Sequence, residues 1–126
     1  MLKIFKSHHP VRHAKSFKYA FEGIFHALIN EPNFRVQLVI VTLAIIFGKK
    51  FGISNTEWGL LAISLGSLLS AEMVNTVVEE VLDNFYDREQ ESNIAVKVVK
   101  DLSAGFVLIT SITALIILVL VFGKRI

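Results

Sequence analysis

The stretch from residue 102 to residue 122 constrains the fold of this chain more than any other feature. It contains no charged side chain and consists almost entirely of apolar residues. A helix of about 20 such residues has the length needed to cross the hydrocarbon core of a bilayer. The mean hydropathy of the chain is +0.59, and its apolar residues gather in runs rather than in the periodic stripes of a soluble domain. The sequence therefore predicts an all-α membrane protein with a span over residues 102–122.

A second apolar run predicts a span over residues 34–51. Its apolar centre, residues 36–47, is shorter than the roughly 20 residues that a crossing helix needs, so flanking residues must contribute. Arg35 lies at one end of this span and the Lys49–Lys50 pair at the other. Because these side chains are long, their charged heads can reach opposite membrane surfaces while their stems stay in apolar surroundings.

The third predicted span covers residues 57–82. The residues from Ser54 to Glu57 fit a capping box, in which the serine hydroxyl and the glutamate carboxylate each accept a hydrogen bond from a backbone N–H at a helix start. Trp58 follows at the expected membrane interface. We find no internal repeat, so residues 1–126 are expected to form a single integral-membrane domain.

The N-terminal region predicts a helix of a different kind over residues 14–30. Its apolar residues recur at helical spacing, and the charged ones fall largely on another face. A basic, aromatic helix of this type suits the headgroup region of an anionic membrane, and the groove of a partner protein is the alternative. The apolar positions are Phe17, Ala20, Phe21, Ile24, Ala27 and Leu28.

The distribution of basic residues predicts the orientation. With three spans, the N-terminal region and residues 84–100 share one side and carry most of the lysines and arginines. Because these residues concentrate in cytoplasmic loops, a multi-pass protein with its N-terminus in the cytoplasm is expected. The net charge of only +2 argues against a nucleic-acid partner. The absence of cysteine excludes disulfides, thiolate metal sites and a cysteine nucleophile.

Several acids occur in the second half of the 57–82 helix. At about 100° per residue, Glu72, Glu79 and Asp83 fall on one face, with Asn75 beside them. We call these four residues the acidic stripe. Ionisable groups at membrane depth are costly unless they face protein or water, so a functional site is the default hypothesis, above all for Glu72, the deepest acid.

The next helix brings opposite charge to this stripe. A short connection over residues 84–92 should make the two helices antiparallel and return Lys100 and Asp101 toward the acids. Carboxylates suit Mg²⁺, which usually takes one or two of them together with substrate phosphates, and a lysine suits a polyphosphate. Salt bridges between the helices are the structural alternative. No P-loop or other common nucleotide-binding motif occurs in the sequence.

Four groups of short strings, in order along the chain, are distinctive together: Phe17-Lys18-Tyr19-Ala20 with Gly23, Asn30-Glu31 with Phe34-Arg35, Glu72-Met73-Val74-Asn75-Thr76 with Glu79 and Asp83, and Lys100-Asp101 with Ala104-Gly105. Over roughly residues 12–121 the chain resembles the prokaryotic diacylglycerol kinase family. Within that family, the residues of these strings are more similar to the undecaprenol kinase branch of Gram-positive bacteria. The resemblance implies a homotrimer in the bacterial inner membrane, with active sites shared between subunits, that transfers phosphate from Mg-ATP to a lipid hydroxyl.

The resemblance also assigns roles to residues of the stripe. It implies that Glu72 contacts the lipid alcohol and takes its proton as general base. Asn75 would position the reacting groups. Glu31 and Glu79 would bind the Mg²⁺ ions that bridge the phosphates of ATP, and Asp83 would be a supporting residue.

Nucleotide and lipid contacts follow from the same resemblance. Lys100 would contact the transferring phosphate, while Asp101 and Tyr19 would hold the nucleotide. Gly23 would permit its close approach, and Arg12 would lie near the lipid or the phosphate. At Asn93 the undecaprenol kinase branch commonly has a histidine, so nucleotide preference is left open.

Two alternatives remain beside phosphorylation of undecaprenol. The first keeps the chemistry and changes the acceptor to diacylglycerol, because the two activities differ only in the lipid pocket. The second belongs to another class: a small oligomeric channel or transporter whose intramembrane acids and lysine bind or conduct ions.

Overall fold

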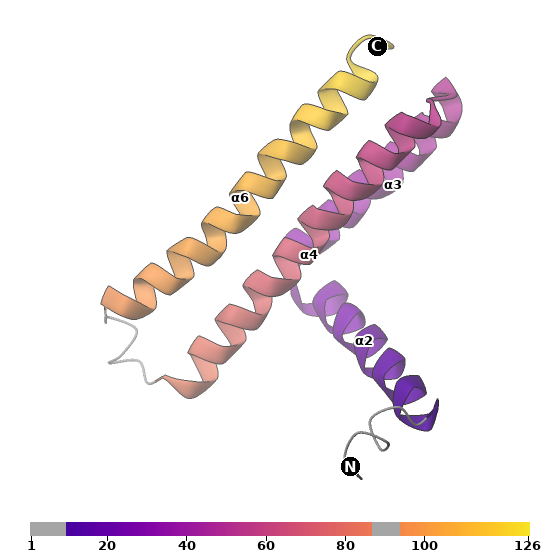
Figure 1. The fold of residues 1–126 in the computed structure, drawn as a ribbon. Helices are drawn as coiled ribbons and strands as arrows, with labels where there is room; N and C mark the ends of the chain where they lie inside the picture. Colours follow the sequence, from indigo (N-terminus) through magenta and orange to yellow (C-terminus); the bar gives the residue numbers. More distant parts are fainter. Residues whose placement is uncertain (1–9, 87–93) are drawn as a thin grey trace, which may run out of the picture. The chain divides into compact units, whose positions relative to one another are not determined.

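The structure is a computed structural model that describes residues 10–86 and 94–126. These residues form the helices α2 (Pro10–Asn30), α3 (Pro32–Phe51), α4 (Asn55–Phe85) and α6 (Ile94–Phe122), and no strand occurs among them (Figure 1). The predicted all-α class is therefore confirmed. The expectation about Asn93 lies outside the described residues. The chain divides between Pro32 and Asn33 into two compact units, which are described in turn.

Helix α2 belongs to the first unit and begins four residues before the predicted start of the surface helix. Pro10 is its first residue, a position where the missing N–H of proline costs no helical hydrogen bond. At its other end the Asn30 side chain donates to the His26 carbonyl at 2.9 Å. The aromatic rings of Phe17 and Phe21 are largely exposed. The amphipathic pattern is thus present in a helix whose apolar side chains still need a partner.

The second unit opens with α3, which turns sharply into α4. Gly52 has a φ of 61°, a left-handed conformation that glycine adopts without steric cost. The Ile53 N–H donates to the Gly48 carbonyl at 3.2 Å, which ends α3 as a Schellman motif ends a helix. The predicted capping box is confirmed: Ser54 N–H donates to Glu57 Oε2 at 2.8 Å, and Glu57 N–H donates to Ser54 Oγ at 3.2 Å.

At this turn the end of α3 is in close contact with the start of α4. A Cβ added to Gly48 would lie 2.5 Å from the Cη2 atom of the Trp58 ring. Only a residue without a side chain therefore fits at Gly48. The indole of Trp58 therefore packs against the backbone of α3 at Gly48.

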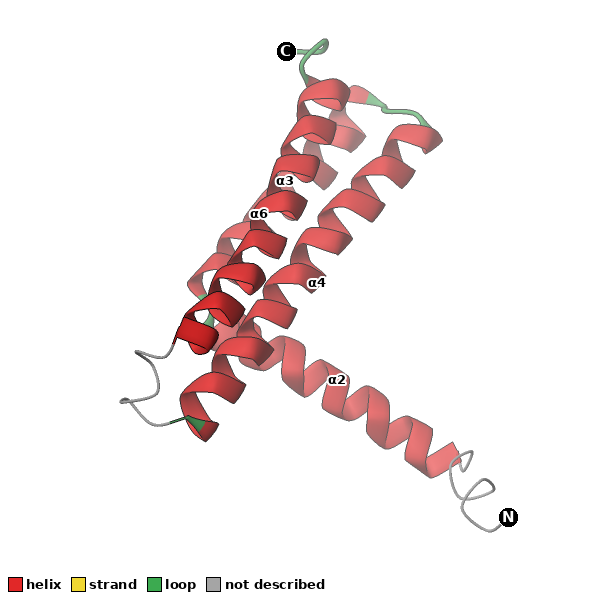
Figure 2. Cartoon of the chain, turned by 60° about the vertical axis from the view of Figure 1, so that its left-hand side comes forward, coloured by secondary structure: helices red, strands yellow, loops and turns green. Residues whose placement is uncertain are grey.

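Helices α4 and α6 run antiparallel beside each other, as the short connection predicts (Figures 1 and 2). Asp83 and Lys100 pair at one end, at 3.2 Å. At the other end Arg125 donates two hydrogen bonds to the Glu57 carboxylate, at 2.8 and 3.0 Å. Small and aliphatic side chains dominate the core of this unit: Ala44, Ile53, Leu61, Leu65, Leu68, Ala114, Val121 and Phe122.

Two of the described helices, α4 and α6, are long and apolar enough to cross a bilayer. Helix α3 is not one of them. Its apolar centre is bounded by Arg35 and by Lys49 and Lys50, so its uncharged stretch is short. The three-span arrangement therefore stays an expectation. Helix α6 leaves a long row of large apolar side chains uncovered in this chain: Leu102, Phe106, Leu108, Ile109, Ile112, Leu115, Ile116, Val119 and Leu120.

Candidate active site

Glu72 is the most enclosed charged residue of the described chain, with only 2% of its surface exposed. It lies in the middle of α4, where the core-facing residues of the helix are otherwise apolar or small. The Gln37 side chain of α3 donates from Nε2 to Glu72 Oε2 at 3.0 Å. The Thr76 hydroxyl donates to the Glu72 carbonyl oxygen at 3.1 Å. Glu72 thus faces the interior of the protein, as expected of an acid at membrane depth. Its side-chain partner there is a neutral amide and not a positive charge.

Asn75 and Glu79 lie about one and two turns further along α4, toward its C-terminal end. The Asn75 amide donates from Nδ2 to Glu79 Oε1 at 3.3 Å. Asn75 is half-buried, whereas Glu79 is exposed. This contact fixes the carboxylate of Glu79 near the helix surface, where its oxygens are accessible to a ligand from solution.

Lys100 returns to the acidic stripe as the sequence predicts. Its Nζ lies 3.2 Å from Asp83 Oδ1 across the α4–α6 contact. Both side chains are partly exposed, at 38% and 56%. The pair joins the two helices at the end where the acids lie, and the Lys100 side chain remains partly exposed to solvent.

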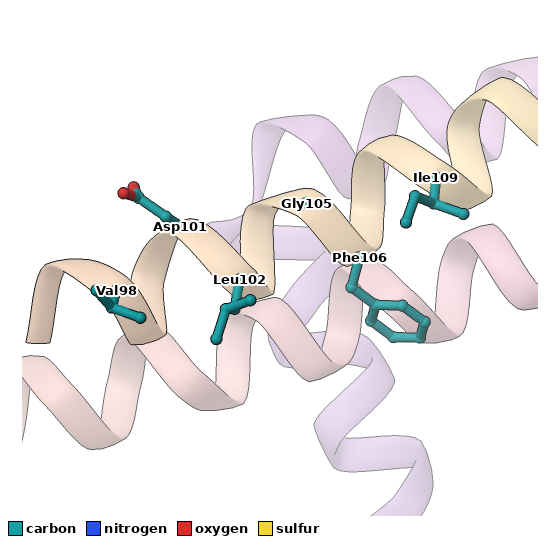
Figure 3. Close-up of a pocket in the computed structure, with 6 residues that line it drawn as sticks. All are labelled: Val98, Asp101, Leu102, Gly105, Phe106 and Ile109. Carbon is teal, nitrogen blue, oxygen red and sulfur yellow. The ribbon is translucent and has the colours of Figure 1, made fainter. Parts of the chain in front are cut away.

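Asp101 has a different environment from that of Lys100. It pairs with Lys97 on its own helix, at 2.5 Å, and both side chains are exposed. Figure 3 shows the Asp101 carboxylate pointing away from the ribbon, above a shallow groove along α6 lined by Val98, Leu102, Gly105, Phe106 and Ile109. The structure therefore places Asp101 on the outer side of α6, next to an apolar surface that this chain does not cover.

The remaining predicted site residues belong to the first unit. Arg12 and Tyr19 are exposed on α2. The space beside Gly23 is open, because an added Cβ would meet no atom within 4 Å. Glu31 follows the last residue of α2, and its N–H donates to the Ala27 carbonyl at 2.9 Å. That these residues lie close to Glu72 and Glu79 stays a prediction.

The carboxylates fit a magnesium ion by their chemistry. No group of three or more histidine, cysteine, aspartate or glutamate side chains gathers within residues 10–86 and 94–126. Mg²⁺ does not require such a cage, because it commonly takes one or two carboxylates and completes its shell with phosphate and water. The exposed carboxylate of Glu79, oriented by an amide, is a suitable hard oxygen donor.

Gln37 is the site residue that the sequence analysis does not identify. It is the single amide within the apolar run of residues 36–47, and the predicted span includes it without giving it a role. Its position is a usable signal, because an isolated amide at membrane depth generally faces another polar group inside a helix bundle. The sequence alone does not say which group that is.

Comparison with known proteins gives a consistent set of relatives. The model of the family described as prokaryotic diacylglycerol kinase matches residues 18–122. The chain is 30% identical over 111 residues to undecaprenol kinase of Bacillus subtilis (strain 168), covering 88% of both chains. It is 28% identical over 102 residues to a diacylglycerol kinase of Synechocystis sp., covering 81% of this chain and 57% of that protein. The family match includes every candidate site residue except Arg12.

Proposed function

Because this chain belongs to the prokaryotic diacylglycerol kinase family and is a lipid kinase, we propose that it phosphorylates the hydroxyl of undecaprenol with ATP. The observation that carries this choice of lipid is the similarity to undecaprenol kinase along 88% of both chains. Diacylglycerol is the second candidate acceptor, supported by the relative from Synechocystis, of which the chain spans about half the length. The family match also favours a kinase over a channel.

Glu72 is the proposed general base. Its carboxylate is buried, and its one described side-chain hydrogen bond comes from a neutral amide and not from a cation. General base catalysis requires such a group near the hydroxyl that attacks. The lipid hydroxyl would reach it from within the bilayer, because the prenyl chain and the apolar helix surfaces would both lie in the hydrocarbon core.

The residues around Glu72 are proposed to handle the phosphates. Glu79, together with Glu31 of the first unit, would hold Mg²⁺, which when bound neutralises charge on the polyphosphate. Lys100, whose side chain is partly exposed, would contact the transferring group. Positioning and electrostatic stabilisation account for most of the catalysis of phosphoryl transfer, so the chain needs no covalent intermediate.

Nucleotide contacts are proposed for residues whose surroundings are open. Asp101 and Tyr19 would hold the nucleotide, and Gly23 leaves room for its approach. Arg12 would lie near the lipid or the phosphate. Asn75 would orient the metal-binding carboxylate, as its contact with Glu79 indicates.

We further propose three spans per chain and a homotrimer in the bacterial inner membrane, with the N-terminus in the cytoplasm. The uncovered apolar row of α6 supports assembly, because such a surface requires either lipid or another protein. The mass of the protein in detergent, corrected for bound detergent, tests the assembly: three chains support the trimer, and one chain contradicts it.

The experiment that tests the function is phosphate transfer in mixed micelles. Purified protein receives Mg-ATP labelled at the γ-phosphate, with undecaprenol or diacylglycerol offered in parallel at equal surface fraction. We expect labelled undecaprenyl phosphate as the main product. A preference for diacylglycerol would select the second candidate, and absence of any lipid phosphorylation by folded protein would contradict the proposal.

A further inference from the structure

Gln37 is the only polar residue among the buried residues of α3, which are otherwise Phe34, Ala44 and Gly48. It is 8% exposed. Burying an amide is unfavourable unless its donor and acceptor both find partners. An aliphatic side chain of similar size would avoid that cost, so the presence of an amide here calls for a specific contact.

The contact is to Glu72 alone. Gln37 Nε2 donates to Glu72 Oε2 at 3.0 Å. Gln37 Oε1 is buried and accepts no hydrogen bond from the described residues. The amide cannot be turned around to correct this, because its oxygen would then face the carboxylate oxygen. The orientation of the amide is thus determined by Glu72, and the buried acceptor is left over as a consequence.

The chemistry of the donor is as informative as its position. A lysine or arginine at residue 37 would form an ion pair with Glu72 and stabilise its charged form strongly. A neutral amide fixes one oxygen of the carboxylate without neutralising it. Among the described residues the one side-chain hydrogen bond to this carboxylate is made to Oε2, so one oxygen is held and Oε1 is left for the incoming hydroxyl.

We propose that Gln37 is a positioning residue, which holds Glu72 Oε2 through its amide N–H so that Oε1 takes the proton of the lipid hydroxyl. In that step the lipid oxygen forms a bond to the γ-phosphorus while the bond from that phosphorus to the bridging oxygen breaks. ADP leaves with the electron pair, and the proton moves to Glu72 Oε1. This inference rests on the proposed function, because it gives Gln37 a role only if Glu72 acts as the base.

Two substitutions separate positioning from packing. Gln37→Met keeps the length of the side chain in an adaptable apolar form, but removes the donor. Gln37→Asn keeps the amide and withdraws it by one methylene. Ser103→Ala is the matched control, because Ser103 is also buried and its hydroxyl makes no hydrogen bond to Glu72 or to any other described residue.

We expect kcat to fall by about 10- to 100-fold in both Gln37 variants, since small displacements of a catalytic group have effects of this size. The KM values for Mg-ATP and for the lipid should stay at the wild-type level, as should all parameters of Ser103→Ala. Nucleotide affinity, measured by binding without turnover, should also be unchanged. A role in packing alone would leave kcat intact in Gln37→Met, where the volume is retained.

The outcomes are distinguishable from failure of the proposed function. If Glu72→Gln is inactive while Gln37→Met and Gln37→Asn turn over at the wild-type rate, the positioning role is wrong and the proposed base stands. If both raise KM with kcat unchanged, Gln37 contributes to binding and the proposal is again overturned. If Glu72→Gln itself turns over normally, the proposed function fails first. Should Gln37→Met not fold, Gln37→Asn, which retains a polar side chain, decides the question alone.

Discussion

The two ends of the α4–α6 pair hold charged residues in different ways. At the ion-paired end, Glu57 is 14% exposed and interacts with both Arg125 and Lys124, while its backbone and carboxylate also complete the capping box. At the acidic end, Asp83 and Lys100 form one partly exposed pair, and Glu79 has only the amide of Asn75 as a described partner. The ion-paired end therefore has the closed network of a structural contact, whereas the carboxylate of Glu79 at the acidic end is accessible to a ligand.

This comparison separates stability from activity along a single helix. Substitutions at the ion-paired end should lower the free energy of unfolding and leave turnover intact at temperatures where the protein is folded. Substitutions at the acidic end should lower turnover and leave the free energy of unfolding nearly unchanged. The following predictions test that division, beginning with the largest effect.

Glu72→Gln should reduce kcat by about 10²- to 10⁴-fold, the usual range for loss of a general base. Binding of Mg-ATP should persist, because the substitution removes a proton acceptor without changing the volume of the side chain. The measurement is lipid phosphorylation in mixed micelles, together with nucleotide binding at equilibrium.

Glu80→Gln is the matched control for Glu72→Gln. Glu80 is exposed on α4, and its carboxylate accepts a hydrogen bond from Asn84 at 3.0 Å. The same change of charge there should leave kcat within a factor of about two, as expected of an exposed surface position. Comparable losses in the two variants would remove the distinction between a buried base and an exposed acid.

Gly48→Ala should destabilise the protein by about 1–3 kcal/mol, the typical cost of overpacking. The added Cβ would lie 2.5 Å from the Trp58 ring, so the indole must move away from the start of α4. Thermal unfolding in detergent measures the effect, and kcat of the folded fraction should be unchanged.

Gly59→Ala provides the control for Gly48→Ala. Gly59 lies in the first turns of the same helix, and an added Cβ meets no atom within 4 Å. Alanine favours the helix over glycine by about 1 kcal/mol, so this variant should be as stable as wild type or more so. Destabilisation of both variants to the same degree would contradict the close contact with Trp58.

Arg125→Met should lower the free energy of unfolding by about 1–2 kcal/mol. The guanidinium donates two hydrogen bonds to Glu57, and removing it leaves a mostly covered carboxylate with Lys124 as its remaining cation. Unfolding should be measured at low and high salt. Lipid phosphorylation at a permissive temperature should match wild type, and a loss of kcat would show that the ion-paired end participates in catalysis.

Much of the fold follows from local signals in the sequence. The apolar run of α6 and the serine-to-glutamate spacing before α4 depend on neighbouring residues only, and both describe the structure correctly. The antiparallel return of Lys100 also follows, because a short connection permits little else. The start of the surface helix is less accurate: α2 begins at Pro10, four residues before the predicted start at residue 14, because proline is well tolerated as the first residue of a helix.

The site is harder to predict because its contacts join distant residues. Glu72 stands out as an acid in an apolar helix, but its partner Gln37 lies 35 residues earlier on another helix. No spacing rule connects the two. Similarly, the sequence predicts the return of Lys100 to the acids correctly, but it does not predict that Asp101 pairs with Lys97 on the exposed side of α6. The face of a helix that meets its neighbour is determined by packing over the whole bundle.

Asp83→Asn should have the smallest effect on stability, at most about 1 kcal/mol, because exposed ion pairs contribute little in water. The variant is informative because it keeps the Lys100 ammonium at the acidic end and removes the Asp83 carboxylate. Without the carboxylate, the Lys100 ammonium loses one described partner and becomes more available to an anion, so the KM for Mg-ATP should fall or stay constant while kcat changes by a factor of about two or less. Lys100→Met, in which the cation itself is lost, should instead raise KM and lower kcat. If Asp83→Asn impairs turnover as strongly as Lys100→Met, the pair acts as one catalytic unit, and Asp83 has a more direct role than the partial exposure of the pair indicates.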